Sequence, residues 1–490
     1  MKDRRLPASW ESVHLGEVLS GIVGGGTPSK ARSDYFEGNI PLMTVKDMKS
    51  RRPLATVFNI TEEALSNSSA KLVPPDTVII ATRMGLGKVV RASFATAINQ
   101  DLKALFPAEG VEKSFLEYWL MSISKKIEGL GTGTTVKGIR VSDVVSLPFS
   151  LPPVPEQRRI VEKIETLFAR LDKGEEAVRQ VQALLKRYRQ SVLKAAVTGE
   201  LTADWREANR DRLEHGSDLL SRILKTRRET WVGRGRYKEP AAPDTTGLAE
   251  LPEGWVWASV DQLSSSDANS LCIGPFGSNL KVEDYRDRGV PLIFVRHIRS
   301  KIFRGHDAKF VNDKKAEELS SHRAYPGDLL ITKMGDPPGD VCIYPDGLPI
   351  AIITADCIRF ATSKAGVSRE FVVAAMESRL VQTQIREISK GVAQQKVTLA
   401  NFKKIAIPLP TFEEQKLIAA IRGEQLAKLE KLESWCETEL VRSAALRQSI
   451  LKQAFSGHLV PQDPSDEPAS ALLARIRAAA PANKTRKANI

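Results

Sequence analysis

The sequence predicts an α+β protein of two similar globular domains, each followed by a long helix, with the two helices pairing as an antiparallel coiled coil in a pseudo-two-fold arrangement. Three observations lead to this fold class. Residues 155–198 carry a heptad-spaced apolar seam, and residues 412–457 have the same layout. In addition, a series of short motifs occurs twice, about 250 residues apart, which indicates a duplicated domain and not a solenoid.

The first long helix is predicted over residues 155–198, where Gly174 is the only glycine. Pro155 suits a first helical turn, Glu156 lies where the helix dipole favours an anion, and Gly199 suits a left-handed cap. Its apolar residues are spaced alternately four and three residues apart, and the pattern is interrupted once, at Gly174. These apolar residues are Ile160, Ile164, Leu167, Leu171, Val178, Val181, Leu185, Tyr188, Val192 and Ala195.

The second long stretch has a looser seam of the same kind. Its apolar positions are Ile418, Ile421, Leu429, Leu432, Cys436, Leu440 and Ile450. Because an isolated helix would expose its seam, we expect the two stretches to pair within the chain. The alternatives are that each helix packs on its own domain, or pairs with another copy in a homodimer.

The repeated motifs align the two halves of the chain. Leu6-Pro-Ala-Ser-Trp10 matches Leu251-Pro-Glu-Gly-Trp255, and Leu151-Pro-Pro-Val-Pro-Glu-Gln157 matches Leu409-Pro-Thr-Phe-Glu-Glu-Gln415. Ile40 to Val45 matches Val290 to Val295, and Gly133 to Ile139 matches Gly391 to Val397. Val73-Pro-Pro-Asp76 with the next four residues matches Tyr325-Pro-Gly-Asp328 with the next four. Short helices are predicted to start at Ser217 and Ser470, where each serine is the expected N-cap.

These motifs predict short strands at residues 77–82 and 329–332 and short helices at residues 114–122 and 369–378. They also predict the order of domains. We expect a first globular domain at 1–153, the first long helix at 154–200, a linker with a short helix at 201–250, a second globular domain at 251–410, the second long helix at 411–460, and a tail with a short helix at 461–490.

Composition limits the class of protein. The 490 residues carry a formal net charge of +13, which favours a polyanionic partner. The N-terminus lacks the apolar core of a signal peptide, and no apolar run approaches the length of a membrane span, so we expect a cytoplasmic protein without a membrane partner. The four cysteines are scattered without paired spacing, as expected of reduced thiols rather than a disulfide framework or zinc site.

Residues that could catalyse a reaction form no recognisable set. The six histidines have no metal-ligand spacing. Gly85-Leu-Gly-Lys88 lacks the upstream glycine and the Ser/Thr of a phosphate loop, and Asp336-Pro-Pro-Gly339 lacks the aromatic residue of amino-methyltransferases. We therefore expect no catalytic residue and no metal or cofactor bound by this chain.

Basic residues, by contrast, lie in the predicted loops of both globular domains. Lys and Arg suit phosphate contacts, whereas Asn and Gln suit adenine edges. Any one of them alone is an ordinary solvated surface charge, but as a group they fit DNA. The candidate DNA-binding residues are Lys30, Lys46, Arg51, Arg52, Arg83, Lys88, Lys137, Arg140, Lys281, Arg296, Arg299, Lys301, Lys333, Gln394, Gln395 and Lys396.

Taken together, and twice in the same order, the motifs resemble the specificity subunit of type I restriction-modification systems. Two more segments support the resemblance: Thr198-Gly-Glu-Leu-Thr-Ala-Asp-Trp205 after the first helix, and Gly457-His-Leu-Val-Pro-Gln-Asp-Pro464 after the second. The resemblance covers nearly the whole chain. It departs at Ser9, which replaces the glycine before the tryptophan.

The resemblance implies a non-catalytic subunit with two target-recognition domains, each of which reads one half of a bipartite double-stranded DNA target. It further implies that the long helices hold these domains apart and dock two methyltransferase subunits, which restriction subunits then join. Adenine methylation and cleavage would be carried out by those partners with S-adenosylmethionine, ATP and Mg²⁺.

Other classes remain open on the residues alone. The first is a stand-alone or regulatory bipartite DNA-binding protein without a partner enzyme. The second is an enzyme with unrecognised methyltransferase or nuclease chemistry, and the third is a scaffold that binds no DNA.

Overall fold

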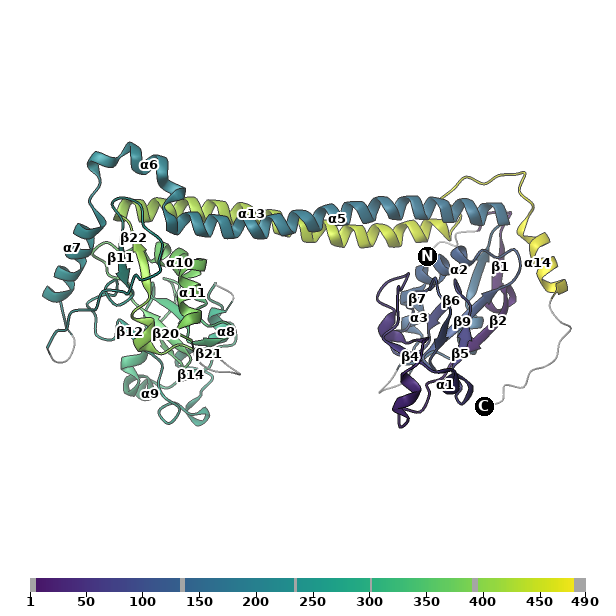
Figure 1. Cartoon of the computed structure of the whole chain (residues 1–490), viewed down its shortest axis with the longest axis horizontal. Coiled ribbons are helices and arrows are strands. Elements are labelled where there is room, and N and C mark those ends of the chain that lie inside the picture. The colour runs from purple at the N-terminus through teal and green to yellow at the C-terminus, as the bar shows by residue number, and fades with distance from the viewer. Residues whose placement is uncertain (1–5, 133–136, 233–235, 300–301, 390–394, 480–490) are drawn as a thin grey trace. The chain divides into compact units, whose positions relative to one another are not determined.

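The computed structural model describes residues 6–132, 137–232, 236–299, 302–389 and 395–479. These residues form two compact units (Figure 1). Unit 1 comprises residues 1–179 and 437–490, and unit 2 comprises residues 180–436. Each unit thus holds one globular domain together with part of both long helices. None of the described helices is long and apolar enough to cross a membrane.

In unit 1 the globular domain is a set of short strands with small helices at its edges. The strands are β1 (Glu11–His14), β2 (Leu19–Gly24), β3 (Ile40–Met43), β4 (Phe58–Ile60), β5 (Lys71–Val73), β6 (Val78–Ala81), β7 (Val89–Val90), β8 (Thr96–Ile98), β9 (Leu102–Pro107) and β10 (Pro148–Leu151). The helices are α1 (Glu62–Ser66), α2 (Lys113–Ser122), α3 (Ser124–Gly129), α4 (Val141–Val145) and α14 (Ala469–Ala479).

Unit 2 repeats this plan. Its strands are β11 (Val256–Ser259), β12 (Leu271–Ile273), β13 (Val290–Ile293), β14 (Phe310–Val311), β15 (Arg323–Ala324), β16 (Leu329–Thr332), β17 (Met334–Gly335), β18 (Val341–Ile343), β19 (Ala351–Ile353), β20 (Cys357–Phe360), β21 (Gln395–Lys396) and β22 (Ala406–Leu409). Its helices are α6 (Ala203–Ala208), α7 (Gly216–Glu229), α8 (Val295–Ile298), α9 (Asp313–Glu318), α10 (Arg369–Glu377), α11 (Arg379–Glu387) and α12 (Leu399–Phe402).

The strand orders show the duplication directly. The four-stranded sheet β2-β9-β6-β7 corresponds to β12-β20-β16-β18, and β4-β3-β8-β5 corresponds to β14-β13-β19-β15. In each unit the first and last strands pair, β1 with β10 and β11 with β22. The predicted strands and short helices of both halves are confirmed by β6, β16, α2 and α10. A two-fold relation between the units stays a prediction.

One motif alignment is wrong by a single residue. Val78 pairs with Leu105 in the same way that Leu329 pairs with Phe360, so the strands match Val78 with Leu329. The sequence repeat matches Thr77 with Leu329. The turn before the strand explains the shift, because its left-handed position is Asp76 (φ 60°) in unit 1 and Gly327 (φ 87°) in unit 2.

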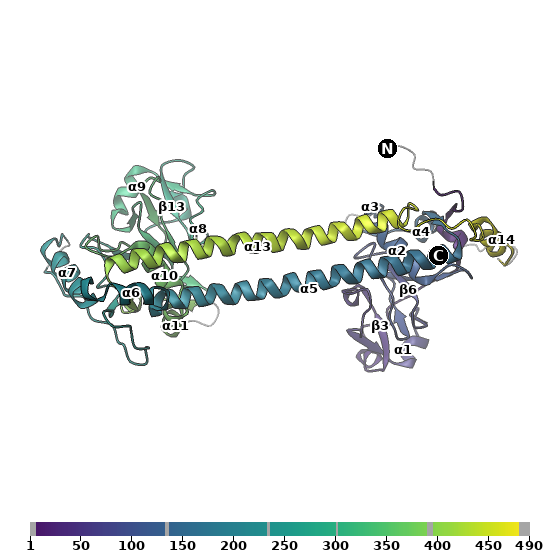
Figure 2. The same ribbon diagram turned by 90° about the horizontal axis from the view of Figure 1, so that it is seen from above.

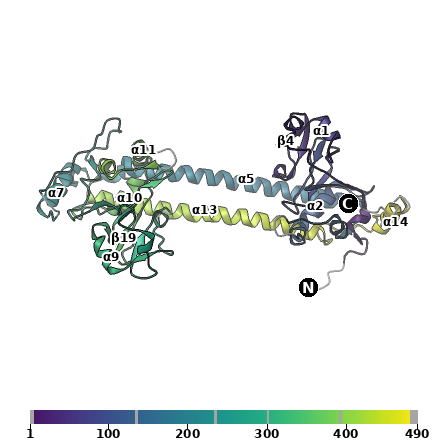
Figure 3. The same cartoon turned by 90° about the horizontal axis from the view of Figure 1, so that it is seen from below.

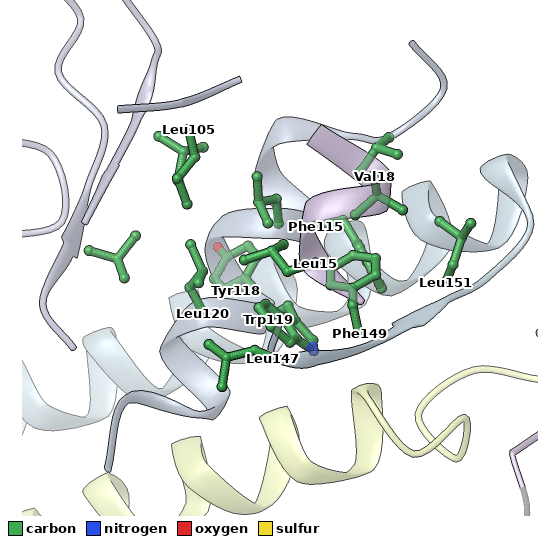
Figure 4. Packing of buried hydrophobic residues seen from close by; sticks show 14 of the residues in the cluster. Leu15, Val18, Leu105, Phe115, Tyr118, Trp119, Leu120, Leu147, Phe149 and Leu151 are labelled. Atoms are coloured by element: carbon green, nitrogen blue, oxygen red, sulfur yellow. The ribbon is translucent and has the colours of Figure 1, made fainter. Parts of the chain in front are cut away.

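The core of unit 1 forms where α2 and β10 meet the long helices. Phe115, Trp119 and Phe149 are packed edge to face, with ring centroids 4.8–5.9 Å apart, and point toward one another in Figure 4. Leu472 and Ile476 of α14 close the same core. In unit 2, Leu219 and Ile223 of α7 contribute to the corresponding core, so α7 and α14 are structural parts of the units.

The long helices are α5 (Val154–Thr198) and α13 (Phe412–Ala454), and they lie side by side in each unit (Figures 2 and 3). In unit 1, Arg447 forms ion pairs with Asp172 and Glu175 at 2.7 and 3.0 Å. In unit 2, Arg189 pairs with Glu433 at 2.9 Å. Partners later in α5 thus lie earlier in α13, so the helices are antiparallel. Pairing within the chain is therefore observed, and knobs-into-holes packing of a coiled coil stays a prediction.

The predicted seam is only partly buried. Ile160, Ile164 and Ile418 are fully buried, whereas Tyr188 and Leu432 are 49% and 48% exposed. The heptad pattern therefore overestimates the buried contact, because some apolar side chains of the predicted seam remain on the surface in each helix.

In each unit, the tryptophan motif is hydrogen-bonded to the Glu-Gln motif. The Trp10 indole N–H donates to Glu156 at 2.9 Å, and the Trp255 indole N–H donates to Glu414 at the same distance. The glutamine that follows each glutamate binds the residue before a short helix. The Gln157 side chain accepts a hydrogen bond from the backbone N–H of Glu112, and the Gln415 side chain accepts one from the backbone N–H of Ser368. The Trp and Glu-Gln motifs recur because each joins a globular domain to the start of a long helix.

The ends of the helices confirm one predicted cap and correct two. Gly199 has φ 76° and ends α5 as a left-handed residue. The predicted N-cap serines are wrong. The N-cap of α7 is His215, whose Nδ1 accepts from the backbone N–H of Ser217, and Ser470 lies inside α14.

Two glycines, one inside a long helix and one at a helix end, test this account of the long helices. A Cβ at Gly423 in α13 would meet nothing within 4 Å, so Gly423→Ala is expected to stabilise the chain by about 1 kcal/mol. A Cβ at Gly199 would lie 2.5 Å from Pro252 in a left-handed backbone, so Gly199→Ala is expected to destabilise it by about 1–2 kcal/mol. Denaturant unfolding of the full chain measures both, and changes of the same sign would contradict the assignment.

Candidate nucleic-acid interface

A hollow opens in unit 1 where the loops after β2, β3, β6 and β8 meet. Its volume is about 1080 Å³. Its lining combines apolar groups with lysines and amides: Thr27, Lys30, Ser33, Phe36, Leu42, Thr44, Val45, Lys46, Phe58, Met84, Gly85, Asn99, Gln100 and Asp101. The strands place these residues together because four loops leave the two sheets at the same edge.

Four of the predicted cations of unit 1 gather around this hollow. Lys30 and Lys46 line it and are exposed. Arg83 lies 3.8 Å from Asp101. Lys88 donates its backbone N–H to Gly85 in the turn at the rim. The arrangement offers positive charge beside apolar surface, which suits a nucleic-acid backbone next to its bases.

Arg51 and Arg52 have a different environment. Arg52 forms two hydrogen bonds of 2.6 and 2.9 Å with Glu117, whose side chain is fully buried in α2. Arg51 lies 3.4 Å from the same carboxylate and 4.6 Å above the Tyr118 ring. Both guanidinium groups are thus already paired within the domain, and their role at DNA stays a prediction.

Lys137 and Arg140 flank Ile139, whose backbone is hydrogen-bonded to Thr82 at the end of β6. Ile139 donates its backbone N–H to Thr82, and Val397 donates likewise to Lys333 in unit 2. The predicted equivalence of these two segments is thus confirmed for their described residues. Arg140 is exposed at the N-terminus of α4, where its backbone N–H donates to Asp143.

In unit 2 some predicted cations gather near the end of β16. Lys333 lies 5.9 Å from the Phe276 ring centroid, and Phe276 is 67% exposed. The Arg299 guanidinium approaches Gly335 of β17. Arg296 is held by Asp307 at 2.6 Å and stacks on Phe294.

The remaining predicted DNA-binding residues of unit 2 lie in separate segments. Gln395 and Lys396 form β21, which pairs with Met334 and Gly335 of β17. Lys281 precedes the 3₁₀ turn Val282–Asp284 and donates its backbone N–H to Asp284. Gln394 and Lys301 lie outside the described residues.

Sequence reasoning missed the uncharged part of the hollow. Phe58, Met84 and Gln100 carry no charge and occur in none of the repeated motifs, so a search for cations passes over them. The available signal is Met84 directly before Gly85, since a large apolar residue beside two closely spaced glycines indicates an exposed turn.

The structure describes all four cysteines, and the reduced state expected from their spacing stays a prediction. All four are free and buried. Burial raises the pKa of the Cys272 thiol to about 11 and that of Cys342 to about 12. Within the described ranges, no group of three or more His, Cys, Asp or Glu residues could hold a metal ion.

Comparison with known proteins identifies the class. The sequence model of the type I restriction modification DNA specificity domain matches residues 7–179 and 307–431, which include most of both globular domains. The chain therefore belongs to this family, and it is a DNA-sequence specificity protein of the type I restriction-modification class.

Named relatives span the whole chain. It is 26% identical to the EcoDI specificity subunit of Escherichia coli over 100% of this chain and 99% of the relative. It is 24% identical to the EcoKI specificity subunit of Escherichia coli strain K12, again over 100% of this chain and 99% of the relative.

Solved structures share the fold. One chain, from work on complex assembly and conformational transition of the type I restriction-modification system, has a TM-score of 0.62 at 18% identity and covers 93% of this chain and 99% of its own length. The HsdS subunit of Thermoanaerobacter tengcongensis has a TM-score of 0.52 at 17% identity, with 93% and 99% covered.

Proposed function

We propose that the chain selects a bipartite DNA target for a type I restriction-modification complex, with each globular domain reading one half of the target. The observation that carries the proposal is the duplicated domain, which has basic side chains in the loops at strand ends in each unit. Lys30 and Lys46 are exposed after β2 and β3 in unit 1, and Lys333, which is half-buried, follows β16 in unit 2.

Two methyltransferase subunits and the restriction subunits are the proposed protein partners. In unit 2 exposed apolar side chains on both long helices support docking there, and they are here called the apolar patch: Val181, Leu184 and Tyr188 of α5, and Leu432 and Trp435 of α13. Their spacing places them on one face of each helix. The Tyr188 hydroxyl also reaches Gln425 across the pair.

Chemistry is proposed to reside in those partners. They would supply S-adenosylmethionine, ATP and Mg²⁺ for adenine methylation and DNA cleavage, while this chain supplies the sequence preference. The family membership and the absence of a catalytic motif from the sequence support this division of roles.

Reconstitution tests the proposal. The purified chain alone, with duplex DNA and labelled S-adenosylmethionine, should transfer no methyl group, and added methyltransferase subunits should restore adenine methylation at a bipartite motif. Leu184→Glu with Trp435→Glu should abolish this restored methylation, whereas Val441→Glu, which alters an exposed side chain outside the patch, should not. Methylation by the chain alone would contradict the proposal.

Salt dependence tests the predicted phosphate contacts. Lys88→Ala should weaken DNA binding across all sequences and reduce the slope of log affinity against log salt by about one, because a phosphate contact releases about one counterion. Gln395→Ala should alter base preference instead. Titrations of the full chain at several salt concentrations measure the slope, and an unchanged slope would remove Lys88 from the DNA interface.

A further inference from the structure

The hollow of unit 1 has an apolar wall that is held open to solvent. Phe58 is 39% exposed, and its ring is packed edge to face against Phe36 with centroids 6.3 Å apart. Met84 is 59% exposed and has φ 47°, a left-handed conformation that is uncommon for a side chain of this size. Strain of this kind at a surface turn indicates a functional position. The wall therefore offers contact to an apolar group that enters from outside.

One amide at the edge of this wall is held in place with its donor free. The Thr27 hydroxyl donates to Gln100 Oε1 at 2.6 Å. Among the described residues, no hydrogen-bond partner is found for Gln100 Nε2. The neighbouring polar groups are already used, because Asn99 donates to Asp101 at 3.0 Å and Arg83 lies 3.8 Å from the same carboxylate. Gln100 thus presents an N–H donor beside the apolar wall.

Two lysines add positive charge to the same hollow. Lys30 and Lys46 line it, and Lys46 Nζ lies 5.6 Å from the Phe58 ring centroid. Their charge matches a DNA backbone, which would bring base edges to the wall and to Gln100.

Thymine is the base whose major-groove edge carries an acceptor, O4, next to a methyl group. We propose that the hollow is the site at which the globular domain of unit 1 recognises a thymine in its half of the target. Gln100 Nε2 donates to O4, Met84 and Phe58 contact the C5-methyl group, and Lys30 and Lys46 contact the flanking phosphates. This inference rests on the proposed function, since it assigns a base to one recognition domain.

The corresponding position of unit 2 differs. The backbone N–H of Asn99 donates to Met43 at the end of β3, and that of Thr354 donates to Ile293 at the end of β13. Gln100 therefore corresponds to Ala355, which has no side-chain donor. The thymine site is thus specific to unit 1, and the two half-sites are expected to differ.

A base that lacks only the methyl group gives a direct test. Sites are first selected from a randomised duplex library by the full chain with its methyltransferase subunits, and each thymine of the selected target is then replaced in turn by deoxyuridine. At one thymine of one half-site, binding should weaken roughly fourfold, the value expected for one buried methyl group. Met84→Ala should remove this difference, and Met84→Leu should retain it.

The other variants separate recognition from folding. Gln100→Ala should relax the preference at the same base pair and leave the other half-site unchanged. Leu72→Ala, which alters a 50% exposed residue in β5, is the matched control and should leave both halves unchanged. Retained recognition of the other bases in the half-site read by unit 1 shows that the substituted domain is folded in each variant.

Three results distinguish the outcomes. A bipartite target in which neither half-site has a methyl-dependent thymine, or a methyl dependence that persists in Met84→Ala and Gln100→Ala, overturns the inference while the proposed function stands. Enrichment of no bipartite motif by the wild-type complex overturns the proposed function itself.

Discussion

Glu117→Ala is expected to destabilise unit 1 by about 3–5 kcal/mol, the range for removing one partner of a buried ion pair. The Glu117 carboxylate is fully buried and lies within 3.4 Å of Arg51, Arg52 and Arg91. Arg91 is itself buried, with a side chain 9% exposed, so it cannot turn to solvent when Glu117 is removed. The substitution destabilises the domain because the three arginines keep their positive charge and lose the carboxylate that all of them contact.

Denaturant unfolding of the full chain measures this effect. Glu128→Ala, which alters an exposed glutamate of α3, is the control and should change stability by less than about 0.5 kcal/mol. We expect Glu117→Ala to lower the transition of unit 1 and leave that of unit 2 in place. A change as small as that of the control would show that the cluster does not stabilise the domain.

Glu414→Ala is expected to have a comparable effect on unit 2. Its buried carboxylate accepts from the Thr202 hydroxyl at 2.7 Å, from Arg206 at 2.6 Å and from the Trp255 indole at 2.9 Å. Alanine leaves these three donors without their acceptor at the start of α13. We expect a loss of about 3–5 kcal/mol, since an arginine and two buried donors lose their partner together.

Glu413→Ala is the matched control, because Glu413 is the neighbouring exposed glutamate in the same first turn. Thermal unfolding monitored by circular dichroism, with both variants and the wild type, measures the difference. If Glu414→Ala and Glu413→Ala unfold together, Glu414 does not anchor the helix to the globular domain.

The equivalent carboxylate in unit 1 is Glu156, which accepts from Trp10 and from Gln462 at 2.6 Å. Burial raises the pKa of the Glu156 carboxyl above its ordinary value, although the hydrogen bonds from Trp10 and Gln462 lower it. A folded pKa above the unfolded one means that the stabilising contribution of this group is present at low pH and is lost as the pH rises through the folded pKa. The hydrogen bonds from Trp10 and Gln462 thus offset part of the free energy that burial of the Glu156 carboxylate costs.

The long helices were predictable because heptad spacing and end signals are local. Residues 155–198 differ from α5 by one residue at the N-terminus, and Gly199 ends it as expected. The duplication was predictable from motifs in fixed order. The one-residue slip at Asp76 was not, because a left-handed aspartate and a left-handed glycine fill the same turn and only strand register shows which residues correspond.

The partnerships between distant residues could not be predicted from the sequence. Trp10 and Glu156 are 146 residues apart, and nothing local signals that one donates to the other. Arg51 and Arg52 showed their charge in the sequence but not the buried Glu117 that holds them. The hollow needed the fold as well, since its uncharged lining comes from four separate loops.

Exchange of one recognition domain tests the central claim most directly. The structure sets the boundaries: replacing residues 15–147 keeps the β1–β10 ladder and the Trp10–Glu156 hydrogen bond. Methylome sequencing of a host that carries the exchanged chain with its methyltransferase subunits reports the new target. The account predicts that one half of the bipartite motif changes while the other half is retained. A motif in which both halves change, or in which neither does, would contradict it.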